Sequence, residues 1–182
     1  MNSENHYFDL IQRYNDWNSL DKFWQAIIHK NTPEWLPGKA LEYFILRAFE
    51  LDGANVRYPY QVKIFNESVE QIDGVIHFQH ISSLVECKDE KDRVNIEPIA
   101  KLRNQLHRRP SGSIGCIFSI NGYTEPALIL SRFVAPQAIL LWEKDSIEFA
   151  LKNRNFCNSL IRKYQALIEE GEPNFNLKSN IL

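Results

Sequence analysis

QIDGVI, at residues 71–76, and SLVECK, at residues 83–88, are two short apolar segments joined by a polar turn. Both are partly β-branched, which predicts the two antiparallel strands of a hairpin. Because side chains alternate between the two faces of a strand, Glu86 and Lys88 share one face. The hairpin also brings Asp73 onto the strand next to Glu86.

The side chains around this hairpin suggest a metal site. A buried strand that places a carboxylate beside an ammonium needs a reason, because burying charged groups is costly. A third carboxylate, Glu42, lies upstream in an apolar helix. Together with Asp73, Glu86 and Lys88 it could hold a divalent cation against a phosphodiester, and hard oxygen ligands favour magnesium or manganese over zinc. Gly74 fits a bulge or a close backbone approach that re-aims the side chain of Asp73.

The order of the remaining elements predicts an α/β fold. An apolar helix is expected at 39–51, and strands are expected at 55–65, 69–78 and 84–88. A helix at 96–107, a strand at 113–120, a helix at 124–133 and a strand at 137–142 complete the pattern. This order predicts three layers, with a central mixed sheet flanked by helices.

The helix expected at 39–51 is apolar on most sides, so its Glu42 is either paired with a neighbour or directed at a site. We favour the site.

The flanking segments predict a three-part organisation. Apolar and aromatic residues at helical spacing, with a break near residues 18–19, indicate an N-terminal helical extension, which ends in a Pro-rich linker at about residue 37. The catalytic domain is expected at 38–170, and its last helix is interrupted near residues 153–155. The tail at 171–182 has little to pack and is expected to be flexible.

These residues resemble the PD-(D/E)xK nuclease superfamily. The motif is an Asp, a hairpin turn and Glu-x-Lys on the next strand, preceded by a helix that carries Glu. The order of elements is most similar to the Mrr-like, restriction endonuclease-like branch. The similarity runs from about residue 38 to about residue 142, through GKALE at 38–42, EQIDG at 70–74, VECK at 85–88 and IFSINGYT at 117–124. Two departures are Ile72, where the superfamily name has proline, and Glu86, where many Mrr-like proteins have Gln.

The resemblance implies a restriction endonuclease-like fold and metal-dependent hydrolysis of phosphodiester bonds, with DNA favoured over RNA and with 5′-phosphate and 3′-hydroxyl products. The catalytic residues would be Asp73, Glu86, Lys88 and Glu42, and the metal ligands would be Asp73, Glu86 and the main-chain carbonyl of Cys87. The expected cofactor is Mg²⁺, for which Mn²⁺ would substitute. Lys88 would orient or help to deprotonate the attacking water. Glu42 would act from the outer shell or hold a second ion through water.

A basic stretch follows the predicted catalytic strand. Residues 98–124 contain no Asp or Glu but hold Lys101, Arg103, Arg108 and Arg109. This stretch begins beside the expected metal site and could track a phosphate backbone. The alternative is a solvated helix face whose basic end complements the helix dipole. We favour nucleic-acid binding, because this stretch contains basic residues and also lacks acidic ones. The formal net charge of -2 argues mildly against indiscriminate binding.

Composition excludes several classes of protein. The chain has 182 residues, 44% of them hydrophobic, which is enough for one well-filled domain. No apolar run is long enough to span a bilayer, and the first residues lack the features of a signal peptide, so we expect a cytoplasmic protein without membrane attachment. Three cysteines with no paired spacing predict buried free thiols rather than a disulfide framework or a zinc site.

Two other classes of function stay open. The chain could be a non-catalytic nuclease-fold subunit, or a nucleic-acid-binding component, of a larger complex, with its aromatic N-terminal segment as the docking surface. It could also be an ordinary α/β protein whose carboxylates are structural, in which case Lys88 begins a solvated charge run and its pair with Glu86 contributes little. For a nuclease, double-strand cleavage with one site per chain would favour a homodimer.

Overall fold

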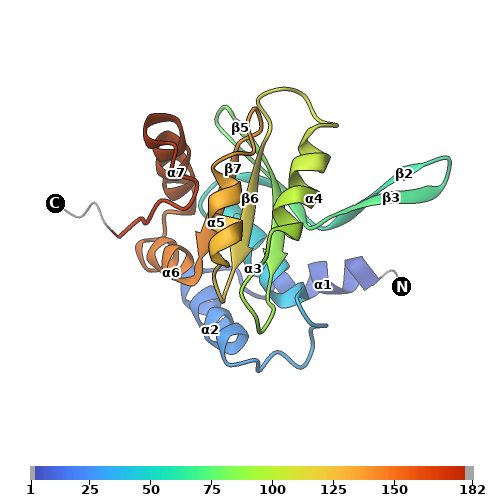
Figure 1. Ribbon diagram of the computed structural model, residues 1–182. Helices are drawn as coiled ribbons and strands as arrows, with labels where there is room; N and C mark the ends of the chain where they lie inside the picture. The colour runs from blue at the N-terminus through green and yellow to red at the C-terminus, as the bar shows by residue number, and fades with distance from the viewer. Residues whose placement is uncertain (1–2, 179–182) are drawn as a thin grey trace.

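A five-stranded mixed sheet forms the middle layer of the fold. The computed structural model describes residues 3–178, and Figure 1 shows the sheet with helices on both sides. The strand order is β1 (Asn55–Arg57), β4 (Gly74–Phe78), β5 (Ile81–Lys88), β6 (Ile114–Ser119) and β7 (Ile139–Glu143). The first three strands are antiparallel, and β5, β6 and β7 are parallel. The predicted α/β fold with a mixed sheet is confirmed.

Helices cover the two faces of the sheet unequally. One face carries α3 (Lys39–Leu51), α6 (Lys144–Asn153) and α7 (Phe156–Glu170), and the other carries α4 (Glu97–Leu106) and α5 (Glu125–Ser131). On β5, Val85 and Cys87 pack with the α3 side, whereas Leu84 packs with the α4 side. Because side chains alternate, Glu86 and Lys88 also face the α4 side.

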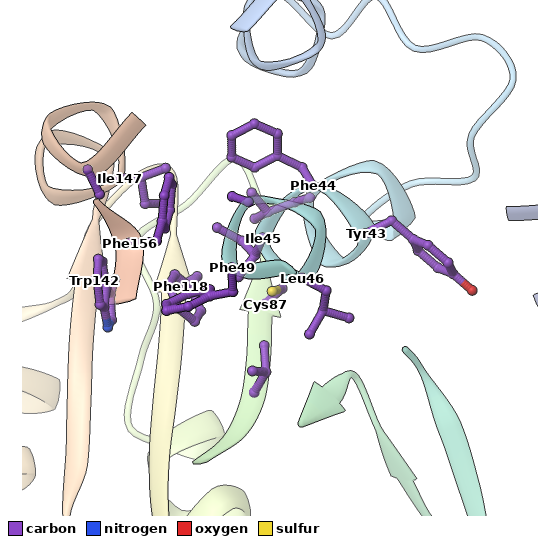
Figure 2. Packing of buried hydrophobic residues seen from close by; sticks show 14 of the residues in the cluster. Tyr43, Phe44, Ile45, Leu46, Phe49, Cys87, Phe118, Trp142, Ile147 and Phe156 are labelled. Carbon is purple, nitrogen blue, oxygen red and sulfur yellow. The ribbon is translucent and has the colours of Figure 1, made fainter. Parts of the chain in front are cut away.

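Phe49 of α3 lies at the centre of the larger core (Figure 2). Its ring centroid is 6.2 Å from that of Phe118 on β6, 6.1 Å from that of Trp142 on β7 and 5.3 Å from that of Phe156 on α7. All four rings are fully buried. Aromatic side chains contribute most to a core per residue, so this cluster holds α3 against the sheet.

The strands predicted at 55–65 and 69–78 are each divided in two. Their outer parts, β2 (Tyr60–Ile64) and β3 (Glu67–Ile72), form a separate two-stranded sheet. We call residues 60–72 the arm, and Figure 1 shows it projecting from the body of the molecule. The prediction of two uninterrupted strands was therefore wrong.

The reason for the division is local chemistry at the root of the arm. The pairing register is the same on both sides of the break, since Arg57 pairs with Val75 and Tyr60 with Ile72. In that register Pro59 lies opposite Asp73, and a proline has no N–H to donate to the ladder. The hairpin therefore stays continuous in register but loses its strand pairing at the position of Asp73.

The N-terminal extension packs into the same core as the rest of the chain. Its helices are α1 (Ser3–Ile11) and α2 (Trp17–Ile28), so the break predicted near residues 18–19 lies earlier, at residues 12–16. The cause is Asp16, whose side chain accepts a hydrogen bond from the backbone N–H of Ser19 at 2.8 Å and caps α2. Tyr7, Phe23 and Trp24 are buried in the larger core, which leaves their rings unavailable as a docking surface.

The segment after α7 packs on the body, contrary to the expectation of a flexible tail. Leu177 is fully buried, and the backbone N–H of Leu141 donates to the carbonyl of Pro173 at 2.9 Å. Lys163 of α7 donates to the carbonyls of Leu141 and Phe175 at 2.8 and 2.6 Å. Residues 179–182 of the predicted tail lie outside the described residues. The interruption predicted near 153–155 is confirmed between α6 and α7.

Two expectations from composition concern cysteines and membranes. Cys87, Cys116 and Cys157 are free and buried, as predicted. Within residues 3–178, no helix combines the length and apolar character needed to cross a bilayer.

Candidate active site

A cleft of about 350 Å³ opens where β5 ends beside the amino end of α3. It is lined by Pro37, Gly38, Glu42, Gln71, Asp73, Glu86, Cys87, Lys88, Asp89, Glu90 and Lys101. The four residues predicted to be catalytic therefore lie together, although they come from α3, the junction of β3 and β4, and β5.

Asp73 occupies the unpaired position between the arm and the sheet. Its side chain is buried and accepts a hydrogen bond from the backbone N–H of Cys87 at 2.9 Å. In a strand, the N–H and C=O of one residue point to the same edge, so the Cys87 carbonyl faces the Asp73 side as well. Burial and the nearby Glu86 carboxylate raise the pKa of Asp73 above its ordinary value.

Glu86 is only 2% exposed and is held by two lysines. The Nζ atom of Lys101, on α4, donates to its two carboxylate oxygens at 2.7 and 3.0 Å. The Nζ atom of Lys88 lies 3.2 Å from its Oε1 atom. Burial lowers the pKa of Lys88, but the carboxylates of Glu86, Glu90 and Asp73 together more than offset this, and the net shift is upward. Glu86 and Lys88 therefore share one face, as the alternation of the strand predicts.

Glu42 lies in the first turn of α3, where it is buried and receives a hydrogen bond from Lys39 Nζ at 2.5 Å. Burial, followed by the Asp73 carboxylate, raises the pKa of Glu42 to about 7. Glu42 is therefore both paired with a neighbour and part of the cleft lining, so the two alternatives predicted for it occur together. Sequence reasoning missed Lys39, although its spacing of three residues from Glu42 on one helix face was a usable signal.

The donors of the cleft suit a hard divalent cation. Among the described residues, no three His, Cys, Asp or Glu side chains form a ready ligand set. The available donors are instead the Asp73 and Glu86 carboxylates and the Cys87 carbonyl, which are all oxygens. Burial raises the pKa of both Asp73 and Glu42, and a neighbouring carboxylate adds to each shift, Glu86 for Asp73 and Asp73 for Glu42. A cation bound among these groups would favour their charged forms. A divalent ion would have to compete with Lys101 for Glu86.

The four basic residues of the predicted stretch lie in three different surroundings. Lys101 reaches into the cleft, whereas Arg108 and Arg109 bind Glu70 at the root of the arm. Arg108 Nε lies 2.6 Å from one carboxylate oxygen of Glu70, and Arg109 Nη2 lies 2.6 Å from the other. Arg103 is half-buried, and its Nε has no hydrogen-bond partner among the described residues. Glu70 was missed, because nothing in the local sequence indicates a partner 38 residues away.

The chain is similar to a family of restriction endonucleases and, at low sequence identity, to two solved structures. The model of the Mrr catalytic domain, described as restriction endonuclease, matches residues 34–149. The protein VC1899 from Vibrio cholerae matches with a TM-score of 0.53 and 14% identity over 75% of this chain; the chain spans 35% of the length of VC1899. A protein of unknown function, AF1548, matches with a TM-score of 0.41 and 14% identity over 67% of this chain and 82% of that one.

The structural likeness to VC1899 supports the fold alone, because the sequences are 14% identical. No curated protein matches the chain. The family model, however, covers more than half of the residues and includes Glu42, Asp73, Glu86 and Lys88. The chain therefore belongs to the Mrr-type restriction endonuclease family.

Proposed function

We propose that the protein is a Mg²⁺-dependent endodeoxyribonuclease that hydrolyses phosphodiester bonds in DNA. The observation that carries this proposal is the gathering of Asp73, Glu86, Lys88 and Glu42 in one cleft at the end of β5. Family membership supports nuclease chemistry in general. The oxygen-only donor set supports magnesium, with manganese as a substitute.

Each residue of the cleft would have a separate task. Asp73, Glu86 and the Cys87 carbonyl would hold the cation, which when bound polarises the scissile phosphate and lowers the pKa of a coordinated water. Lys88 would donate a hydrogen bond that orients the attacking water and offsets negative charge on the phosphate. Glu42, kept in place by Lys39, would act from behind the direct ligands through a water.

Lys101 would change partners when the cation binds. It now neutralises Glu86, and a cation on Glu86 would take over that role. The Lys101 side chain is 46% exposed at the edge of the cleft, so its ammonium could then contact a phosphate oxygen of the substrate. The basic residue predicted to bind nucleic acid would thus do so at the scissile bond itself.

The biological setting that we propose follows from these roles. Cutting both strands of DNA with one site per chain would require a homodimer or a partner that supplies a second site. Three free cysteines are compatible with the reducing cytoplasm, where such an enzyme would meet DNA.

Cleavage of supercoiled plasmid with Mg²⁺ or Mn²⁺ tests the proposal. We expect metal-dependent nicking or linearisation by the native chain and a loss of at least about 100-fold in Asp73→Asn and Lys88→Met, because each removes a group that acts on the reacting phosphate. Lys22→Met, which changes an exposed lysine of α2, is the matched control and should cleave normally.

A folded native chain that cleaves neither plasmid nor single-stranded DNA or RNA, and does not bind Mn²⁺ in calorimetry, would contradict the proposal. That result would favour the non-catalytic subunit instead. Mn²⁺ binding that is lost in Asp73→Asn, without cleavage of plasmid, would show that the metal site is intact and that the substrate class is wrong.

A further inference from the structure

The tip of the arm combines backbone strain with an exposed aromatic ring. The turn between β2 and β3 consists of Phe65 and Asn66, which have positive φ values of 49° and 68°. Turns of this geometry favour Asn or Gly, and a bulky side chain is disfavoured there. The Phe65 residue is 97% exposed, so packing does not repay the strain. A strained residue without a packing role points to a function.

The arm is fixed to the active site at its root. Arg108 and Arg109 bind Glu70 of β3, and the Nε2 atom of Gln105 on α4 donates to the carbonyl of Gln71 at 3.2 Å. Gln71 also lines the cleft. Asp73 directly follows β3, and the root of the arm therefore lies beside the proposed metal site.

Basic charge lies at the root of the arm rather than along it. Within residues 60–72 the acids Glu67 and Glu70 outnumber Lys63, but at the root Arg108 and Arg109 bind Glu70, and Arg57 of β1 is exposed. Basic side chains at the root and an exposed aromatic ring at the tip are features of surfaces that contact nucleic acid.

The dimensions of the arm also suit duplex DNA. Phe65 lies eight positions before Asp73 in the sequence, and at about 3.3 Å per residue this distance is about 26 Å. This length corresponds to roughly seven or eight base pairs. A two-stranded ribbon fits the major groove, which is about 12 Å wide.

We propose that the arm is a duplex-DNA-binding element and that Phe65 packs against bases several pairs away from the scissile phosphate. This inference rests on the proposed nuclease function, since the ligand is the substrate of the same cleft. Aromatic side chains contact bases by stacking or by wedging between steps. Phe65 therefore sets the affinity for the flanking duplex and leaves the chemistry to the cleft.

Phe65→Asn separates the role in binding from a role in folding. Asn tolerates positive φ, so the melting temperature should stay the same or rise. Affinity should fall about 5- to 100-fold for a labelled duplex of about 24 base pairs, measured by fluorescence anisotropy with calcium in place of magnesium. In plasmid cleavage KM should rise while kcat changes less than about twofold. Phe65→Trp keeps a stacking surface and should bind within about threefold of the native chain.

Phe133→Asn is the matched control, because Phe133 is also exposed (72%) but follows α5; its affinity should be unchanged. Native affinity in Phe65→Asn would overturn the inference, and metal-dependent cleavage by the native chain would then show that the nuclease proposal still stands. A native chain that neither binds the duplex nor cleaves plasmid would overturn both. If Phe65→Asn instead lowers the mass of the DNA-free protein in sedimentation, the tip is a contact between two copies, and the assignment to DNA is wrong.

Discussion

At the scale of single residues, Glu86 is held tightly by its surroundings. It is buried to 2% exposure on the α4 side of β5 and is neutralised by Lys101 and Lys88. A buried carboxylate is stable only when such partners are present. The same lysines make Glu86 less available to a cation, so metal binding and the ion pair with Lys101 compete.

Lys101→Met should reveal that competition. Removing the ammonium frees Glu86, and we expect Mn²⁺ to bind about two- to tenfold more tightly in calorimetry. Plasmid cleavage should nevertheless fall by at least about tenfold, because a positive charge near the substrate phosphate is lost. Lys91→Met, at an exposed position after β5, should change neither quantity. Weaker or unchanged Mn²⁺ binding in Lys101→Met would show that Lys101 does not compete with the cation.

At the scale of elements, the contact between α3 and β4 places Glu42 beside Asp73. Gly74 makes this contact possible, since a Cβ atom built on it would lie 2.5 and 2.7 Å from the two terminal carbons of Leu46. Leu46 is fully buried in the core, and the contact therefore has little room to adjust. The glycine after Asp73 therefore makes room for a helix side chain, whereas its position in the sequence predicted a bulge or a close backbone approach.

A double-mutant cycle between Gly74 and Leu46 tests this contact. Gly74→Ala should lower the unfolding free energy by about 1–3 kcal/mol through overpacking, and Leu46→Ala should lower it by about 2–5 kcal/mol through the cavity it leaves. The double variant should lose clearly less than the sum, because the new methyl group fills part of that cavity. Urea denaturation measures all three. If the two losses of unfolding free energy simply add, the backbone at residue 74 moves away, and the new methyl group does not collide with Leu46.

At the scale of the whole molecule, Lys163 joins the sheet to the C-terminal segment. It is fully buried and donates to one carbonyl of β7 and one of the segment after α7. Burial lowers the pKa of Lys163 from 10.5 to about 7. Between these two values the unfolded chain binds more protons at this position than the folded chain. The contribution of Lys163 to stability therefore rises as the pH rises from about 7 toward 10.5.

Lys163→Met should remove this pH dependence. At pH of about 9 we expect a loss of about 1–3 kcal/mol, because two buried carbonyls lose their donor. The difference from the native chain should shrink as the pH falls toward about 7. Urea denaturation across this range measures it, with Lys152→Met on α6 as an exposed control. A difference that is independent of pH would show that Lys163 keeps its charge in the folded state.

Local sequence determined the parts of this protein that depend on short-range patterns. The alternation of side chains on one strand placed Glu86 and Lys88 on a common face, and the apolar stretch at 39–51 coincides with α3. Hydrophobic periodicity and breaker residues such as proline and glycine encode these features directly, because the features involve residues that are close in sequence. The mixed sheet followed from the order of these elements.

Only the tertiary structure decided which distant groups meet. It pairs Lys101 of α4 with Glu86 rather than leaving it on a free basic face, joins Arg108 and Arg109 to Glu70, and docks Leu177 where the composition suggested a loose tail. It also sets Pro59 opposite Asp73, which divides one hairpin into sheet and arm. The physical reason is that ion pairs, strand register and burial depend on contacts between residues far apart in the sequence. The residues next to a charged or apolar side chain in the sequence do not indicate which distant residue it will contact.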